Sequence, residues 1–391
     1  MAEHSGWHDA RRRTVVAVPV VGATALYLAT RGDDATAPEG AATLSLAPAG
    51  GGVRAADIAL AARADRRMAR TAPRAAAAGV WRSEVIRTDV FRMVGVTWVG
   101  DPTRVRVKVH RPGTGWTPWR VLAPQTDVPD EGDAEDAGRT GTELVLTGRA
   151  DRIAVELTDG IREDLVLTLI EPDGSKDTHQ LTPGKEETRR NRRRPSILSR
   201  RDWGADESWR DGAARYNRTI QQMHVHHTVS SNDYSRDDVP GLIRGMYRYH
   251  THNLGWSDIG YNFLVDRFGR IWLGRAGGAK RNVRGAHTLG FNHQSFGVSV
   301  IGNFETASPS NLVVTALVHL GAWKLHMHGR NPTGTVVAYS RGSDKYPSGR
   351  KVRLPTIDGH RDTNDTACPG RHLYARIPDV RRRAKARIAR F

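Results

Sequence analysis

The chain has one cysteine, Cys368, among 391 residues. A single thiol excludes an intramolecular disulfide, so this residue must serve packing, reactivity or metal binding. Long apolar runs are also missing, because the run from Val15 to Ala29 is shorter than the roughly 20 residues of a membrane span. Aromatic residues make up only 7% of the chain and are not interleaved with basic ones. That pattern argues against a single-strand nucleic-acid binder.

Negative charge is the other deficit, since 42 acidic residues face 59 basic ones and leave a formal net charge of +17. The excess gathers at residues 189–194 and 371–391. Such a surface favours polyanionic surroundings, including the phosphate polymers of a bacterial wall, although a solvated linker and helix face are the plainer alternative. No groove-reading motif accompanies the charge, so nucleic acid is not expected as a partner.

Residues 1–37 have the layout of an export signal, in which Arg11–Arg13 precede the short apolar run. The stretch "RRRTVVA" resembles a twin-arginine signal, and a Sec signal or a weak uncleaved anchor is the alternative. Residues Ala35–Ala37 offer a cleavage site, which Pro38 disfavours. We therefore expect a protein that is secreted or held at the cell wall.

The next residues divide by composition. Residues 38–79 are rich in Ala, Gly and Arg and are interpreted as a tether. Residues 80–171 contain short runs of period-two alternation between turn residues, which predicts an all-β, sandwich-like domain. It includes an acidic loop, "PQTDVPDEGDAEDAGR". Trp116 and Trp119 are expected to pack against the sheet, with a carbohydrate platform as the alternative.

Residues 172–196 form a charged linker, and residues 197–391 mix strands with helices. We expect an α/β mixed domain, in which helices flank a central mixed sheet. The predicted elements are a strand in 221–228, an amphipathic helix in 237–255, a hairpin in 261–275, a buried strand in 296–304, a helix in 308–329 and a basic helix in 372–391.

The chemistry is concentrated in "MHVHHT" and "GHRDTNDTACPG". The first stretch contains His224, His226 and His227, and the second contains His360 and Cys368. Alternation along a strand puts His224 and His226 on one face and His227 on the other, without choosing between the first two. Two histidines and one thiolate would leave one position of a tetrahedral zinc open for water, whereas four protein ligands would argue against hydrolysis.

Blue copper is the competing interpretation of a His/His/Cys set, with Met as an axial ligand. Met223 would point away from His224 and His226, so zinc is expected. Zinc with an open position supports amide hydrolysis, which also needs a donor to the oxyanion. Tyr261 is the candidate for that role, and Thr366 offers a second polar contact.

Five stretches resemble the peptidoglycan recognition proteins and the related type 2 N-acetylmuramoyl-L-alanine amidases. They are "ILSRRDWGADES", "MHVHHT", "GWSDIGYNFLVDRFGRIWLGR", "VRGAHTLGFNHQSFGVSVIGNF" and "GHRDTNDTACPG". The resemblance covers the chain from about Ile197 to the end and implies a mixed sheet with a groove over the metal. Residues before Ile197 lie outside it, and nothing there indicates an enzymatic role.

The resemblance implies zinc ligands at His226, His360 and Cys368 and a catalytic tyrosine at Tyr261. Thr366 matches a position that is Lys in phage relatives and often Thr in recognition proteins.

The resemblance also implies substrate-binding residues at His287 and Asn292, with His227 as a third candidate. A tight turn at these residues is the structural alternative. The stretch "GRAGGAKRNVRGAHT" lacks the Gly-Trp pair of many animal relatives, so the choice between diaminopimelate and lysine in the stem peptide is not implied.

We therefore expect an exported, monomeric zinc amidase that cleaves between N-acetylmuramic acid and L-alanine in peptidoglycan. Its β domain and basic segments would dock it on the wall. The alternative is a non-catalytic peptidoglycan-binding protein. In this family, lost catalysis accompanies a lost thiolate, and Cys368 is present here.

Overall fold

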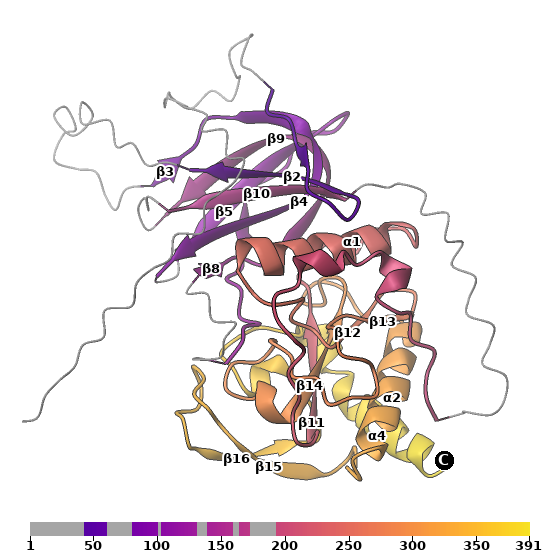
Figure 1. Cartoon of the computed structure of the whole chain (residues 1–391). Helices are drawn as coiled ribbons and strands as arrows, with labels where there is room; N and C mark the ends of the chain where they lie inside the picture. The colour runs from indigo at the N-terminus through magenta and orange to yellow at the C-terminus, as the bar shows by residue number, and fades with distance from the viewer. Residues whose placement is uncertain (1–42, 61–79, 101–102, 131–138, 159–163, 173–192) are drawn as a thin grey trace, which may run out of the picture.

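The computed structural model describes residues 43–60, 80–100, 103–130, 139–158, 164–172 and 193–391. The predicted export signal at 1–37 and most of the predicted linker at 172–196 lie outside these residues. The described chain forms a strand-rich N-terminal part packed on a mixed C-terminal part (Figure 1). Within the described ranges, no helix is long and apolar enough to cross a membrane.

The N-terminal part is one antiparallel sheet of ten strands, in the order β1-β2-β10-β4-β9-β5-β6. Three short strands lie off this path, where β3 pairs with β9, β7 with β5, and β8 with β4. Alternate residues of β5 are buried, as period-two patterning requires, so the expected all-β domain is confirmed. The strands are β1 (Ala47–Pro48), β2 (Val53–Ala59), β3 (Trp81–Arg82), β4 (Ile86–Val99), β5 (Val105–Arg111), β6 (Gly115–Trp116), β7 (Arg120–Leu122), β8 (Arg139–Gly141), β9 (Val145–Leu157) and β10 (Val166–Pro172).

Part of the predicted tether belongs to this sheet. We expected residues 38–79 to be a tether, but β1 and β2 lie within that range, and β2 pairs with β10 along its full length. Val53 and Ala55 are buried. The sequence hides this strand because Ala, Asp and Arg have low strand propensity, and pairing with a central strand outweighs that preference.

The two tryptophans expected on the sheet are half-buried. The Lys108 ammonium lies 5.0 Å from the Trp116 ring centroid and 5.2 Å from that of Trp119. Arg82 and Arg106 also lie over Trp119. Both rings therefore cover basic side chains of the sheet through cation–π contacts, at its outer face.

The C-terminal part contains the expected mixed sheet, with strand order β13-β12-β14-β11-β17. The β12–β13 pair is antiparallel and the other three pairs are parallel. All six residues of β11 are buried, as is usual for a parallel strand covered on both faces. The strands are β11 (Gln222–His227), β12 (Phe263–Val265), β13 (Ile271–Leu273), β14 (Ser295–Val300) and β17 (Ile357–Gly359), with a separate hairpin of β15 (Thr335–Tyr339) and β16 (Lys351–Pro355).

Helices cover both faces of this sheet. Helices α2 (Asn311–His326) and α4 (Ile377–Ile388) share an apolar core with Met223 and Val225 on one face. Helix α1 (Asp238–Arg248) packs on the other face, with Leu264 and Trp272 in its core. The short α3 (Arg371–Tyr374) precedes α4. The helices predicted in 237–255, 308–329 and 372–391 are all present.

Helix α1 also joins the two parts of the molecule, because it lies under the N-terminal sheet (Figure 1). Met93 and Ile170 of the sheet belong to the same apolar core as Leu242 and Met246 of α1. The N-terminal part is therefore docked on the C-terminal part through a shared hydrophobic core.

Tyr249, just after α1, packs closely against the N-terminal sheet. Its hydroxyl donates to the Thr142 carbonyl at 2.8 Å. A Cβ on Gly95 would lie 2.6 Å from the Tyr249 ring, and one on Gly141 would lie 2.8 Å from its hydroxyl. Both positions must be glycine for this approach. Polar contacts surround it, since Asp57 accepts from both Arg248 and Asn253.

Candidate metal centre

Strand β11 decides which histidine enters the centre. Met223 and Val225 face the α2–α4 core, so His224 and His226 face the opposite side. His224 is removed from the centre by Asp358 of the neighbouring β17, whose carboxylate lies 2.5 Å from His224 Nδ1. His226 lies further along the strand, with Nδ1 in the centre. The neighbouring strand thus resolves the choice that alternation leaves open.

Four side chains converge at the end of β11. They are Asp127, His226, His360 and Cys368, and their donor atoms lie within 4.8 Å of one another. His226 Nδ1 is 2.7 Å from Asp127 Oδ1, and His360 Nδ1 is 2.8 Å from the same oxygen. The distance from Cys368 Sγ to His226 Nδ1 is 3.8 Å. All four side chains are buried.

These donors fit a zinc ion. Two ligands of a tetrahedral zinc are about 3.3–3.6 Å apart, close to the separation of Cys368 Sγ and His226 Nδ1. The Asp127 oxygen is nearer to the imidazoles because it accepts a hydrogen bond from His226. His360 is buried, its Nδ1 faces the Asp127 carboxylate at 2.8 Å, and among the described residues its Nε2 has no hydrogen-bond partner. One thiolate and one carboxylate would balance the charge of Zn²⁺.

Burial dominates the electrostatics of the centre. It raises the pKa of the Cys368 thiol well above its usual value, and the Asp127 charge adds to that effect. It lowers the pKa of His226 to about 4, against the opposing pull of Asp127. The pKa of Asp127 itself is held well below its usual value by the facing imidazoles. A thiol of this kind ionises when a cation binds beside it, so metal binding would release its proton.

A second set of contacts orients the ligands. His287 Nδ1 lies 3.1 Å from His226 Nε2, which leaves His226 Nδ1 directed at the centre. Burial lowers the pKa of His287 well below its usual value, so this ring is neutral. Glycines at 285 and 297 make room for it, because a Cβ at either position would lie 2.4 Å from the ring. Such partners fix the tautomer and orientation of a metal-binding histidine.

The two predicted catalytic residues also reach the centre. Tyr261 donates to Asp127 Oδ2 at 2.7 Å, and burial raises its pKa well above the usual value. Thr366 accepts from the Cys368 amide at 3.2 Å and also contacts Thr126. The structure thus gathers both residues around the same carboxylate and thiol.

The three predicted substrate-binding residues are buried. His287 lies behind His226, as described. Asn292 accepts from the His287 and Thr288 amides, and its Nδ2 donates to Val128 and Asp130. His227 points away from the centre and accepts from the Phe304 amide. Their role in substrate binding stays a prediction.

Asp127 is the residue that the sequence analysis missed. It belongs to the acidic loop of the N-terminal part, where we saw no sign of a role in the site. With it, four protein groups face one point, one more than the three ligands that we expected. The fourth group comes from a different part of the chain than the other three, and no spacing within a motif signals it.

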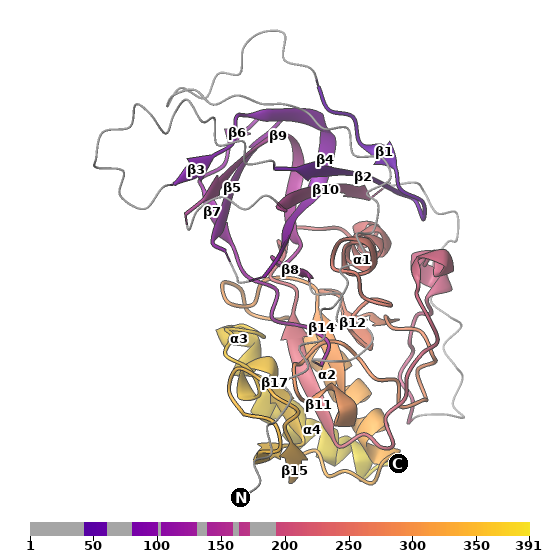
Figure 2. The same ribbon diagram turned by 60° about the vertical axis from the view of Figure 1, so that its left-hand side comes forward.

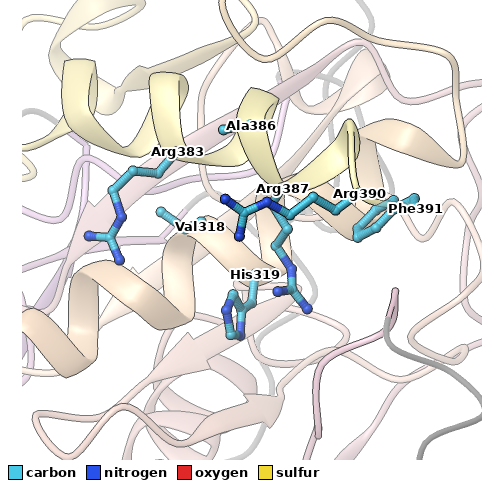
Figure 3. A pocket seen from close by; sticks show the side chains of 7 residues that line it. All are labelled: Val318, His319, Arg383, Ala386, Arg387, Arg390 and Phe391. Atoms are coloured by element: carbon cyan, nitrogen blue, oxygen red, sulfur yellow. The ribbon is translucent and has the colours of Figure 1, made fainter.

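A separate cavity of about 370 Å³ lies between α2 and α4 (Figure 3). Burial and the nearby Arg390 lower the pKa of Arg387. Positive charges thus repel one another here, and an anion would relieve that repulsion. The lining contains no carboxylate side chain and consists of Val318, His319, Arg383, Ala386, Arg387, Arg390 and Phe391.

Comparison with known proteins covers both parts of the chain. The family described as N-acetylmuramoyl-L-alanine amidase matches residues 216–371, and the family described as Rv3811 N-terminal galactose-binding domain-like matches residues 55–190. The second match agrees with the all-β fold of the N-terminal part.

Individual relatives match the C-terminal part. Peptidoglycan-recognition protein 1 of Holotrichia diomphalia is 33% identical over 183 residues, which is 47% of this chain and 79% of the relative. Peptidoglycan-recognition protein SC2 of Drosophila melanogaster is 28% identical over 183 residues, 46% of this chain and 84% of the relative. The solved Drosophila PGRP-LB is 29% identical, with 46% and 92% of the two chains covered and a TM-score of 0.37. From the sequence matches, the chain belongs to the family of peptidoglycan recognition proteins and type 2 N-acetylmuramoyl-L-alanine amidases.

Proposed function

We propose that this protein is a zinc-dependent amidase that hydrolyses the bond between N-acetylmuramic acid and L-alanine in peptidoglycan. The observation that carries the proposal is the shared carboxylate. One oxygen of Asp127 faces His226 and His360, and the other accepts from Tyr261. The tetrahedral intermediate of amide hydrolysis likewise has two oxygens on one carbon. The groups that face the two Asp127 oxygens are therefore spaced to hold that intermediate.

The residues divide the work of hydrolysis. His226, His360 and Cys368 would hold the zinc, and bound zinc supplies a Lewis acid that lowers the pKa of water. Tyr261 would donate its hydroxyl proton in a hydrogen bond to the oxyanion, as it does to Asp127. Burial raises the pKa of Tyr261 well above its usual value, so its hydroxyl stays protonated and can donate this hydrogen bond.

Thr366 has a positioning role in this proposal. Its hydroxyl oxygen accepts from the Cys368 amide and so fixes the loop that carries the thiol. The loop is also held at its start, where the Cys368 carbonyl accepts from the Arg361 amide. The sulfur is thereby presented to the imidazoles rather than to solvent.

The alternative is a peptidoglycan-binding protein without turnover. The relatives are named for recognition, and the matched family is named for the amidase activity. Retention of Cys368 favours catalysis, because in the family that the chain resembles lost catalysis accompanies a lost thiolate.

Purified peptidoglycan tests the proposal. The zinc-loaded protein should release muramyl glycan and free L-alanine amino groups, and a chelator should stop the release. Bound zinc should equal one ion per chain by atomic emission. A zinc-loaded variant in which Asp127 is substituted provides the decisive sample. If it binds muropeptides but releases no amines from several wall types, the protein is a peptidoglycan-binding protein without turnover.

We infer a second contact with anionic wall polymers at the cavity between α2 and α4. The guanidinium groups of Arg387 and Arg390 give a concentrated positive charge beside a cavity with room for phosphate groups. Arg390→Ala should weaken binding to a soluble polyphosphate about threefold at low salt, with Arg353→Ala on β16 as the control. Equal binding by both variants would remove this contact.

We also infer export through residues 1–37. A reporter fused to these residues should reach the outside of the cell, and changing Arg11, Arg12 and Arg13 together to Lys should block a twin-arginine route while leaving a Sec route intact. A reporter that stays in the cytoplasm would contradict export.

A further inference from the structure

Residues 124–130 follow β7, where the chain leaves the N-terminal sheet towards the C-terminal part (Figure 2), and they bring Asp127 to the metal centre. The start of this segment is tied to the sheet, where Pro124 bridges Thr142 and the Gln125 amide donates to Gly141. Two prolines, at 124 and 129, restrict its backbone and lower the entropy lost on ordering. We name residues 124–130 the inserted segment.

Successive residues of the inserted segment contact successive residues of the site. Thr126 lies 3.2 Å from Thr366, hydroxyl to hydroxyl. Asp127 then faces the metal ligands and Tyr261. The Val128 carbonyl accepts from Asn292 at 3.1 Å.

The segment ends in a second buried carboxylate. Asp130 accepts from the Gly290 amide at 2.9 Å and from Asn292 Nδ2 at 3.0 Å. Asp127 and Asp130 are each only 1% exposed. Burying two carboxylates is costly unless each is fully paired, so the fit to these partners is specific.

The inserted segment therefore covers the predicted site. Tyr261, Thr366 and Asn292 were expected to face substrate, and each contacts the segment instead. A muramyl peptide that reaches Tyr261 has to displace Asp127. An oxygen from this carboxylate also takes the fourth corner of a tetrahedral zinc, which hydrolysis needs for water.

We propose that Asp127 is the fourth protein ligand of the zinc and that the inserted segment holds the enzyme latent by filling its substrate groove. The inference rests on the proposed function, because latency is meaningful only if the open site is an amidase. The docked sheet keeps the carboxylate beside the centre at high effective concentration. Substrate affinity is then reduced by the fraction of molecules in which the segment is displaced.

Cobalt substitution tests the coordination without relying on activity. In the Co²⁺-loaded wild-type chain, added azide should leave the visible absorption bands unchanged, because no exchangeable position is open. In Asp127→Ala the bands should shift on azide addition. Asp151→Asn is the matched control, since this carboxylate of the same sheet pairs with His110, away from the centre. A wild-type spectrum that shifts as readily as that of Asp127→Ala would overturn the proposal.

Binding and turnover complete the test. A muramyl peptide with an N-methylated, non-hydrolysable lactyl amide should bind Asp127→Ala at least about tenfold more tightly than wild type by calorimetry. Release of amines should rise by a similar factor. Asp130→Ala, which leaves the metal ligands intact, should show a smaller gain and guards against misfolding of the first variant.

The outcomes separate the two proposals. If Asp127→Ala opens the cobalt shell and binds the peptide more tightly but releases nothing, latency of a binding site stands and the amidase proposal falls. If wild type and both variants bind and hydrolyse equally, the amidase stands and latency falls.

Discussion

The two parts of the molecule contribute to the metal centre in different ways. The C-terminal part brings His226, His360 and Cys368 from a central strand and an adjoining loop, within stretches that resemble a known family. Among the described residues, the N-terminal part contributes Asp127 alone, from a segment between two short strands. The difference shows that three donors of a site can be recognised from their motifs while a fourth, from another part of the chain, carries no motif of its own.

The interface explains why the second contribution is precise. Helix α1 shares its core with the N-terminal sheet, and Tyr249 fits a gap made by two glycines. A carboxylate carried by a freely tethered domain would sample many positions. Here the domain is docked, so its loop reaches the same atoms each time.

The largest effect is expected from removing a metal ligand of the C-terminal part. Cys368→Ser should lower amidase activity more than about 100-fold, because a hydroxyl is a poor substitute for the thiolate ligand. Zinc content should fall with it, measured by atomic emission. The domain interface should be unaffected, since Cys368 does not contact the sheet core. Full activity in a zinc-loaded Cys368→Ser sample would contradict the ligand assignment.

Breaking the interface should have the next largest effect. Tyr249→Ala removes a buried ring and its hydrogen bond to Thr142, so the free energy of unfolding should fall by about 3–5 kcal/mol in urea. Looser docking should also raise activity, if the inserted segment restrains it. Tyr339→Ala, an exposed position on β15, is the control for loss of a tyrosine. An unchanged stability would mean that the two parts do not share a core.

Tyr261→Phe separates catalysis from metal binding within the C-terminal part. Loss of the hydroxyl should reduce turnover about 100-fold while zinc content stays at the wild-type value. The same variant removes one hydrogen bond to Asp127, so the inserted segment should be displaced more readily. Steady-state kinetics alongside metal analysis give both readings. Equal turnover would exclude Tyr261 from the reaction.

Mild acid, within the first pH unit below 6.5, should have the smallest of the four effects. Burial lowers the pKa of His250 to about 3, against 6.5 when unfolded. Above pH 6.5 both states are neutral, and the free energy of unfolding is unaffected. As the pH falls from 6.5 towards 3, only the unfolded state takes the proton, so stability drops by about 1.4 kcal/mol per pH unit for this histidine.

The loss of stability in acid should be concentrated in the C-terminal part. The described N-terminal part contains one histidine, His110, whereas the C-terminal part buries several. In zinc-free protein, backbone amides of the C-terminal part should therefore lose protection first on acidification, measured by hydrogen exchange. His250→Gln should reduce the slope. A slope that is unchanged in His250→Gln would contradict the burial of a neutral ring.

Prediction from sequence succeeded where the signal is local. Period-two alternation gave β5 and its neighbours, and the amphipathic stripe of residues 237–255 gave α1. The strand β2 was missed because its residues are small or charged and its stability comes from pairing with β10. His226 could be separated from His224 only through the family resemblance, and the structure adds the physical reason in Asp358 of β17.

The amino-acid sequence alone determined the histidine and thiol donors of the metal centre and the two fold classes, because motifs and periodicity act over a few residues. Only the tertiary structure decided that Asp127 faces His226 across a separation of 99 residues. That contact depends on how the sheet docks against α1, and docking is set by shape and burial over many distant residues. No short stretch of sequence contains this information.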